Sequence, residues 1–163
     1  MEIGEAELTD IDMAFDLLKN AADWLQKKGI DYWQDWLSPP QNFKDWIKQG
    51  FKEKQFFFVY EDNQLIGMFR LQWNDELFWG KQVDNSGYIH SLTVDRRYCG
   101  LGKGAMIIKE VENICRKNDK NYLRLDCGIS VKRLCDYYKN QGFSSKGTVK
   151  VLGEELVLFE KAL

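Results

Sequence analysis

Three alternating glycines constrain this chain more than any other feature, because they lie where a predicted strand gives way to a predicted helix. The strand covers residues 87–95, and the segment Cys99-Gly-Leu-Gly-Lys-Gly104 follows it. Glycine can adopt positive φ angles and can approach a ligand without a Cβ atom in the way, so successive main-chain N–H groups can converge on an anion. The positive end of the following helix also favours a phosphate. The sequence therefore predicts a phosphate-binding loop at residues 99–104.

Two well-known phosphate loops do not fit this segment. The loop of nucleotide hydrolases requires Gly-Lys-Ser/Thr, whereas Lys103 is followed by Gly104. The dinucleotide fingerprint requires Gly-x-Gly-x-x-Gly and an acidic residue about 20 positions later, whereas this chain has Gly-x-Gly-x-Gly. A glycine-rich helix start that binds no ligand is the simplest alternative.

Hydrophobic periodicity and turn residues predict the order of the elements. A first strand is followed by a helix at 9–29, a short helix near 42–50, a hairpin of 55–60 with 65–73, a loop at 74–86, the strand at 87–95, a helix after the glycine loop, a strand at 122–126, a helix at 131–141, and strands near 143–150 and 154–161. The strand–helix–strand unit at 88–126 requires a parallel crossover, whereas the hairpins are antiparallel. A mixed sheet with helices on both faces follows.

Two helices carry local signals of their own. Thr9 and Asp12 have the spacing of a capping box, which would begin the first helix. In the helix after the glycine loop, Glu112 and Arg116 are spaced to support each other on the outer face.

Length and composition exclude several classes of protein. A chain of 163 residues with 44% hydrophobic residues is long enough for one compact domain, 1–163. A net charge of −2 provides no basic field for nucleic acid, and no apolar run is long enough for a membrane span. Four cysteines without a Cys-x-x-Cys pair and a single histidine argue against a zinc site. We expect a soluble, cytoplasmic protein with reduced thiols and no metal.

Two segments of the chain resemble motifs of the GNAT superfamily of N-acetyltransferases. Leu92-Thr-Val94 followed by Cys99-Gly-Leu-Gly-Lys-Gly104 is similar to the strand and loop that hold the coenzyme A pyrophosphate. Leu123-Arg-Leu-Asp-Cys127 and the later Tyr138-Lys-Asn-Gln-Gly-Phe143 are similar to the fifth strand and the Tyr-x-x-x-Gly-Phe helix end. The resemblance implies an α/β (α+β) fold: a mixed, mostly antiparallel sheet of about seven strands, with a central parallel pair and about four helices.

The resemblance also implies acetyl-CoA as the acetyl donor and a set of residues that bind it. Cys99 stands where many members have Gln or Arg, and Val131 where many have Asn. Backbone N–H groups tolerate such changes, so we still expect the coenzyme to bind. Arg96 and Arg97 could also reach its phosphates. The implied coenzyme-binding residues are Leu92, Thr93, Val94, Cys99, Gly100, Leu101, Gly102, Lys103, Gly104, Ala105, Val131 and Arg133.

Acetylation of an amine needs a neutral nitrogen, a donor for the thioester oxygen, and a proton for the leaving thiolate. By resemblance, the oxygen donor lies in residues 92–94 and Tyr138 is the proton donor; a core tyrosine is the alternative for Tyr138. His90 is the candidate base, with packing or substrate contact as the alternative. Asp126 could polarise a water, although a solvated or helix-capping role is simpler.

The predicted acceptor is a primary amine of a small molecule or peptide, which attacks the thioester directly. Tyr32, Trp33 and Trp36 lie where members of the family cover their substrate, and aromatic rings suit an amine with an apolar body; closing the core is the alternative role. We expect a monomer or homodimer without nucleic-acid or membrane partners. A non-catalytic acyl-CoA sensor of the same fold, or a nucleotide-binding regulator, are the alternative functions.

Overall fold

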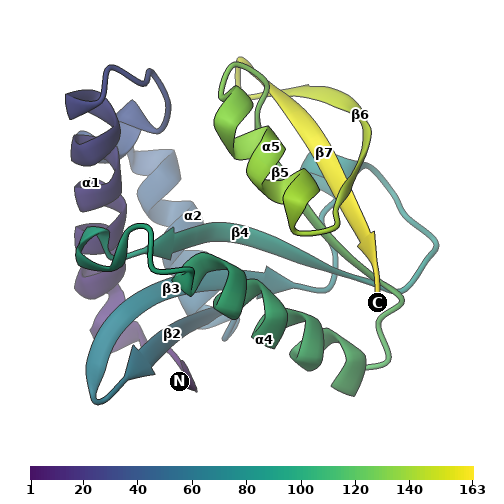
Figure 1. Cartoon of the computed structure of the whole chain (residues 1–163), viewed down its shortest axis with the longest axis horizontal. Coiled ribbons are helices and arrows are strands. Elements are labelled where there is room, and N and C mark those ends of the chain that lie inside the picture. Colours follow the sequence, from purple (N-terminus) through teal and green to yellow (C-terminus); the bar gives the residue numbers. More distant parts are fainter. The chain divides into compact units, whose positions relative to one another are not determined.

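The computed structural model describes all residues, 1–163, as seven strands, five α-helices and three short 3-10 turns (Figure 1). In chain order they are β1 (Glu2–Glu5), η1 (Leu8–Asp10), α1 (Ile11–Lys27), η2 (Gln34–Leu37), α2 (Gln41–Lys52), β2 (Phe56–Glu61), β3 (Gln64–Gln72), α3 (Glu76–Trp79), β4 (Ser86–Val94), η3 (Arg96–Tyr98), α4 (Lys103–Lys117), β5 (Tyr122–Gly128), α5 (Lys132–Asn140), β6 (Ser144–Val151) and β7 (Glu154–Ala162). No helix combines the length and apolar character that crossing a membrane requires.

The strands form one mixed sheet in the order β1-β2-β3-β4-β5-β7-β6. The β4–β5 pair is parallel, whereas β1–β2, β2–β3, β5–β7 and β6–β7 are antiparallel. This confirms the predicted fold class and element order. The short helix α3 lies within residues 74–86, for which the sequence predicted only a loop.

The chain divides into two compact units, and β4 contributes residues to both. The first unit contains Met1–Leu71 and Ser91–Gly104, and the second contains Gln72–His90 and Ala105–Leu163. The assignment of the whole chain to a single domain stays a prediction.

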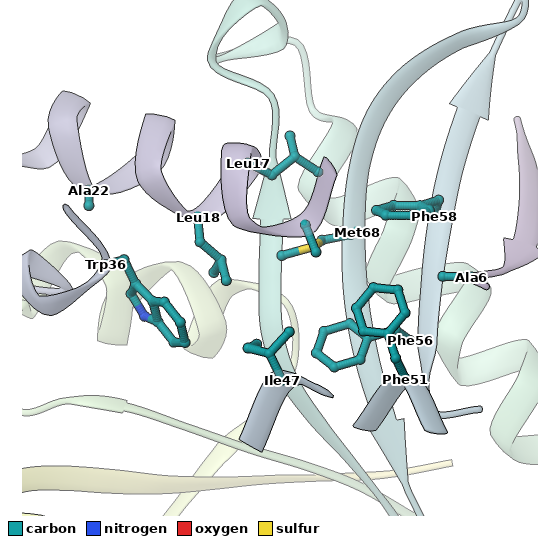
Figure 2. Close-up of a cluster of buried hydrophobic side chains, with 11 residues drawn as sticks. Ala6, Leu17, Leu18, Ala22, Trp36, Ile47, Phe51, Phe56, Phe58 and Met68 are labelled. Atoms are coloured by element: carbon teal, nitrogen blue, oxygen red, sulfur yellow. The ribbon is translucent and has the colours of Figure 1, made fainter. Parts of the chain in front are cut away.

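The core of the first unit is aromatic and aliphatic, and α1, α2, β2 and β3 supply most of it (Figure 2). The buried side chains of α1 recur at the helical period, at Ala14, Leu17, Leu18, Ala21 and Ala22. Phe51 of α2 stacks on Phe56 of β2, with 4.6 Å between ring centroids. Burial of this apolar stripe, rather than a side-chain cap, therefore stabilises α1.

The start of α1 differs from the predicted capping box. The N–H of Glu7 donates to Asp10 Oδ2 at 3.0 Å, and η1 precedes α1, so the chain turns before the helix begins at Ile11. The hairpin of β2 and β3 is as predicted. Its turn residues Asp62 and Asn63 have φ angles of 49° and 60°, which short polar side chains tolerate.

In the second unit, one face of β5 and β7 packs against helices. Tyr138 of α5 contacts Phe159 of β7, with 6.0 Å between the ring centroids, and Lys161 Nζ donates to Glu112 of α4. Glu112 is 2% exposed, so its predicted position on the outer face of α4 is wrong. Burial raises the pKa of Glu112, but the hydrogen bonds and positive charges of Lys161 and Lys109 together outweigh that effect and hold the pKa below its ordinary value.

The opposite face of β5 carries a buried ion network around Arg124. Its guanidinium donates to Glu160 Oε2 at 2.6 and 2.8 Å, to the Asp84 carboxylate at 2.6 and 2.8 Å, and to Tyr88 Oη at 3.0 Å. Burial lowers the pKa of Arg124, whereas the hydrogen bonds to Asp84 and Glu160 raise it above its ordinary value. Because every charge here is paired, the network joins β4, β5 and β7 without leaving an isolated buried ion.

A substitution at Gly50 would test the packing between α2 and the sheet of the first unit. A Cβ atom at Gly50 would lie 2.6 Å from Phe56 Cε2 and 2.8 Å from Arg70 Nε, and Gln55 holds that guanidinium by two hydrogen bonds. Overpacking of this kind costs about 1–3 kcal/mol. Alanine is favoured over glycine in a helix by about 1 kcal/mol, which on average does not offset that cost. We expect Gly50→Ala to lower the free energy of unfolding in urea.

Gly4→Ala is the matched control, because no atom lies within 4 Å of a Cβ built at Gly4. Its free energy of unfolding should stay within about 0.5 kcal/mol of the wild type. A Gly50→Ala variant as stable as the wild type would contradict the close approach of α2 to Phe56 and Arg70.

Candidate active site

The glycine loop connects β4 to α4 and has the backbone that the sequence predicted. Gly100 and Gly102 have φ angles of 81° and 72°, and a Cβ built at either would meet no atom within 4 Å. The space above both residues is therefore open to a ligand. At Gly102 the chain enters α4, whose first N–H groups have no acceptor within the helix. These features fit an anion such as a diphosphate.

Two of the loop amides are used within the loop itself. The N–H of Cys99 donates to the carbonyl oxygen of Arg96 at 3.2 Å, and that of Leu101 donates to Tyr98 at 3.3 Å. Among the residues predicted to bind the coenzyme, Gly100, Gly102, Lys103, Gly104 and Ala105 are therefore the better sources of amide donors.

Three basic side chains around the loop donate hydrogen bonds to oxygen atoms of the protein and so help to hold the loop in place. Lys103 Nζ donates to both carboxylate oxygens of Glu61 at 2.6 and 2.8 Å, which leaves its main-chain N–H for a phosphate. Arg96 donates to the carbonyl oxygen of Val94 at 2.6 and 3.0 Å, and Arg97 pairs with Asp95 at 2.8 Å. Arg133, at the start of α5 in the second unit, is exposed.

The backbone of strand β4 is irregular one residue after His90. Ser91 has a φ angle of 50°, which is uncommon for a residue with a side chain, and Thr93 Oγ1 donates to its carbonyl oxygen at 3.0 Å. A positive φ angle interrupts the regular extended backbone of a strand. The predicted segment Leu92–Val94 begins directly after it.

The parallel ladder between β4 and β5 is short and ends before His90. It pairs Ser86 with Tyr122, Gly87 with Leu123, and Tyr88 with Arg124. Continued along both strands, this register places His90 opposite Asp126. Because side chains alternate between the faces of a strand, both residues lie on the face that carries Tyr88 and Arg124.

His90 lies between two carboxylates, one at each ring nitrogen. Its Nε2 is 2.9 Å from Asp75 Oδ2, and its Nδ1 is 3.6 Å from Asp126 Oδ1. The side chains are 8%, 3% and 11% exposed for His90, Asp75 and Asp126. The ring of Phe78 covers the imidazole, with 4.8 Å between centroids. His90, the predicted base, is thus fixed in position rather than loosely packed.

Asp126 is the residue of this cluster whose pKa is clearly shifted from its ordinary value. Burial raises its pKa to about 6, and the negative charges of Asp75 and Glu154 act in the same direction, whereas His90 opposes them. Its Oδ1 is buried and accepts no hydrogen bond. A carboxylate in this state binds a proton or a cation strongly, so Asp126 is neither solvated nor a helix cap.

Helix α5 carries two further predicted residues. Val131 is the residue before the helix and makes no side-chain cap, because it has no polar side chain. Tyr138 is 7% exposed and packs against Phe143 and Phe159, each with 6.0 Å between centroids. Its role as proton donor stays a prediction.

The thiols of Cys127 and Cys135 are 3.5 Å apart, and the cysteines of the chain are free.

The three aromatic residues predicted to contact substrate belong to the first unit and have different environments. Trp36 is 9% exposed and forms part of the core cluster (Figure 2). Its ring centroid lies 5.2 Å from that of Phe43. Tyr32 and Trp33 are half-buried and stacked at 5.8 Å. Trp36 thus packs the core, and Tyr32 and Trp33 have the exposed surface that a substrate contact requires.

Sequence reasoning missed Asp75, the partner of His90 Nε2. Its carbonyl oxygen accepts the N–H of Trp79 in α3, so the pattern Asp75-Glu76 is a helix start, and that local signal is present in the sequence. A pocket of about 480 Å³ lies elsewhere in the second unit, beside α5, and contains Lys132, Cys135, Lys139 and Thr148 but neither His90 nor Asp126.

The chain has relatives among acetyltransferases. The model of the acetyltransferase (GNAT) family matches residues 18–143. The uncharacterized N-acetyltransferase YesJ of Bacillus subtilis is 31% identical over 138 residues, which are 80% of this chain and 74% of the relative.

Solved structures share the fold. A GNAT-family acetyltransferase from Listeria monocytogenes has a TM-score of 0.80 at 24% identity, with 99% of this chain and 94% of that chain covered. A structure of AAC(6')-Ib in complex with ribostamycin and coenzyme A has a TM-score of 0.75 at 14% identity, with 98% and 92% covered. Since the family model spans most of the chain and agrees with the observed sheet and glycine loop, the chain belongs to the GNAT family of N-acetyltransferases, enzymes that take their acetyl group from acetyl-CoA.

Proposed function

We propose that the chain transfers an acetyl group from acetyl-CoA to a primary amine of a small molecule or peptide. The observation that carries this proposal is the arrangement of functional groups along β4. Within five consecutive residues, this strand has a buried imidazole held between two carboxylates, a positive φ angle at Ser91, and the segment Leu92–Val94 that leads toward the glycine loop.

A base is needed because the acceptor is protonated in water. An alkylammonium with a pKa near 10.4 leaves roughly one molecule in a few thousand neutral at pH 7. Only the neutral nitrogen has a lone pair that can attack a carbonyl carbon. The cluster of His90, Asp75 and Asp126 supplies proton acceptors in a buried position, which supports an amine acceptor.

The residues that would hold the coenzyme are those of the glycine loop and of β4. Gly100 and Gly102 provide the open turn, and the first amides of α4 provide donors for the diphosphate. The edge of Leu92–Val94 is suited to the pantetheine arm, and one of its N–H groups to the thioester oxygen. When bound, acetyl-CoA supplies an acetyl group that is already activated as a thioester.

Two side chains of this chain move protons in the proposed reaction. His90, held between its two carboxylate partners, accepts the ammonium proton of the acceptor. Tyr138 donates a proton to the departing sulfur, in line with its place in the Tyr-x-x-x-Gly-Phe pattern. Tyr32 and Trp33 cover the apolar body of the acceptor. The AAC(6')-Ib structure contains ribostamycin, which supports a small-molecule amine as the first acceptor class to test.

The glycine loop yields a binding test. Gly102→Val places a branched side chain at a φ angle of 72° and in the open space above the loop. We expect acetyl-CoA to raise the thermal stability of the wild type, by about 2.7 kcal/mol at 100 times its Kd, whereas ATP and NAD do not. Calorimetry should show at least a tenfold weaker Kd for Gly102→Val.

Gly153→Val is the control for backbone strain, since Gly153 has a φ angle of 87°, open space for a Cβ, and a place in the turn between β6 and β7. It should bind acetyl-CoA as the wild type does. Equal loss of affinity in both variants, or none in either, would contradict a coenzyme site at the glycine loop.

Tyr138 yields a turnover test, with Tyr137→Phe as the neighbouring control. Removal of a proton donor should lower kcat for Tyr138→Phe by about 10²-fold or more while the Kd for acetyl-CoA stays within twofold. Release of free thiol from acetyl-CoA, measured across aliphatic polyamines, aminoglycosides and peptide N-termini, provides the rate. Wild-type kcat in Tyr138→Phe would remove Tyr138 from the mechanism.

A further inference from the structure

We propose that Cys127 and Cys135 are an oxidative modification site, at which a reversible disulfide forms and slows the enzyme. The oxidant is a hydroperoxide, and hydrogen peroxide is the member of that class to test. The bond itself follows from the second unit alone. Its effect on turnover rests on the proposed function, because that effect acts through Tyr138.

The two thiols are in contact between β5 and α5, which lie beside each other in the second unit (Figure 1). Their Sγ atoms are 3.5 Å apart, and both cysteines are free. The S–H of Cys135 donates to the carbonyl oxygen of Gly128 at 3.7 Å, so Cys127 is the donor in the contact between the two sulfur atoms. The resting state is therefore a pair of thiols that already face each other.

A pocket gives a small oxidant access to one of the two thiols. The pocket of about 480 Å³ beside α5 is lined by Cys135 but not by Cys127. Cys135 is 8% exposed, whereas Cys127 is 1% exposed. Lys132, Ser145 and Thr148 also line this pocket, so its wall is polar enough for a peroxide to enter. An oxidant in the pocket therefore meets Cys135 first.

Cys127 is suited to the second step of the reaction rather than to the first. Burial raises the pKa of the Cys127 thiol, and its hydrogen bond to Cys135 acts in the same direction. Because the thiolate is the form that attacks a peroxide, a buried thiol in this state does not start the reaction. Once Cys135 is oxidised, however, its sulfur lies next to that of Cys127, and proximity favours the attack.

The reaction balances with hydrogen peroxide as the only oxidant. The sulfur of Cys135 attacks one peroxide oxygen, the O–O bond breaks, and the departing oxygen leaves as water with the thiol proton; Cys135 becomes a sulfenic acid. The sulfur of Cys127 then attacks that of Cys135, the S–O bond breaks, and the hydroxyl group leaves as water with the Cys127 proton. The two sulfur atoms lose two electrons, which the two peroxide oxygens gain. Dithiothreitol reverses the bond by thiol–disulfide exchange.

Helix α5 carries the effect of the bond to Tyr138. An S–S bond is about 2 Å long, so the two sulfur atoms must approach each other by about 1.5 Å from their present 3.5 Å. Both side chains lie in a packed interior, which transmits such a movement to its neighbours. Cys135 and Tyr138 are three positions apart on α5, and both are buried. The disulfide therefore displaces the residue that gives the departing sulfur its proton in the proposed reaction.

The other two cysteines provide the comparison. Cys115 is buried on α4 and does not line the pocket, and burial raises its pKa to about 12. Cys115→Ala is therefore the matched control, because it removes a buried thiol that the pocket does not reach. Cys99 is exposed in the glycine loop and reports whether the oxidant was sufficient.

The test treats the wild type, Cys127→Ala, Cys135→Ala and Cys115→Ala with hydrogen peroxide, which catalase then removes. Free thiols are blocked with iodoacetamide before digestion without a reductant. Trypsin releases the two cysteines in separate peptides, Leu125–Lys132 and Leu134–Lys139. In the wild type and in Cys115→Ala, mass spectrometry should find these peptides joined, with the loss of two hydrogen atoms, and dithiothreitol should separate them. The other two variants should yield no such product.

Release of thiol from acetyl-CoA, with the best acceptor of the amine panel, measures the effect on turnover. Peroxide should lower kcat of the wild type and of Cys115→Ala by about tenfold or more, and dithiothreitol, removed before the assay, should restore it. Before oxidation, Cys127→Ala and Cys135→Ala should keep the wild-type kcat within about twofold, and peroxide should cause no reversible loss in either. All four proteins keep Cys99, so oxidation of the glycine loop would slow all of them alike.

The outcomes distinguish this inference from the function of the enzyme. Separate peptides in a wild type whose Cys99 is fully oxidised would overturn the modification site, whatever the acceptor. Joined peptides with an unchanged kcat, or an equal reversible loss in Cys127→Ala and Cys135→Ala, would overturn the effect on turnover. If no amine releases thiol with the reduced wild type, the proposed function fails, and the joined or separate peptides still decide whether the site exists.

Discussion

The rest of the site depends on a parallel ladder between β4 and β5 that contains only three residue pairs. At its last pair, Tyr88 and Arg124 share a network in which every charge has a partner. Two residues further along both strands, beyond the end of the ladder, His90 and Asp126 lie on the same face. His90 Nδ1 and Asp126 Oδ1 are 3.6 Å apart. The same face of the sheet thus contains an ion network in which the charges are paired and, next to it, the cluster of His90, Asp75 and Asp126.

Strand β4 leads from this cluster toward the glycine loop by way of Ser91. Ser91 has a φ angle that is unfavourable for serine, and Thr93 stabilises this conformation by a hydrogen bond to the Ser91 carbonyl oxygen. Further along, Lys103 is held by Glu61 and Arg96 by the Val94 carbonyl oxygen, so side chains keep the loop in place while main-chain amides remain for an anion. In the proposed reaction backbone groups bind the donor molecule and buried side chains handle protons, and on that proposal the departures at Cys99 and Val131 are compatible with membership of the family.

Local signals allowed the fold to be predicted from the sequence, and tertiary contacts explain most of the differences. The turn residues Asp62 and Asn63 predicted the hairpin, and the glycines predicted the loop, because both depend on a few adjacent residues. Glu112 was placed on the wrong face because its partner, Lys161, is 49 positions away. Trp36 could not be assigned to the core from its neighbours alone. The pairing of His90 with Asp126 required the parallel register, and Asp75 required the position of α3. The cytoplasmic location and the state as monomer or homodimer stay predictions.

The most direct measurement is the titration of the Asp126 side-chain carboxyl by carbon-13 NMR, with the signal assigned by its absence in Asp126→Asn. A carboxyl buried beside His90, Asp75 and Glu154 should titrate with a pKa of about 6. A midpoint near the ordinary aspartate pKa of about 3.9 would show a solvated carboxylate and would contradict the account.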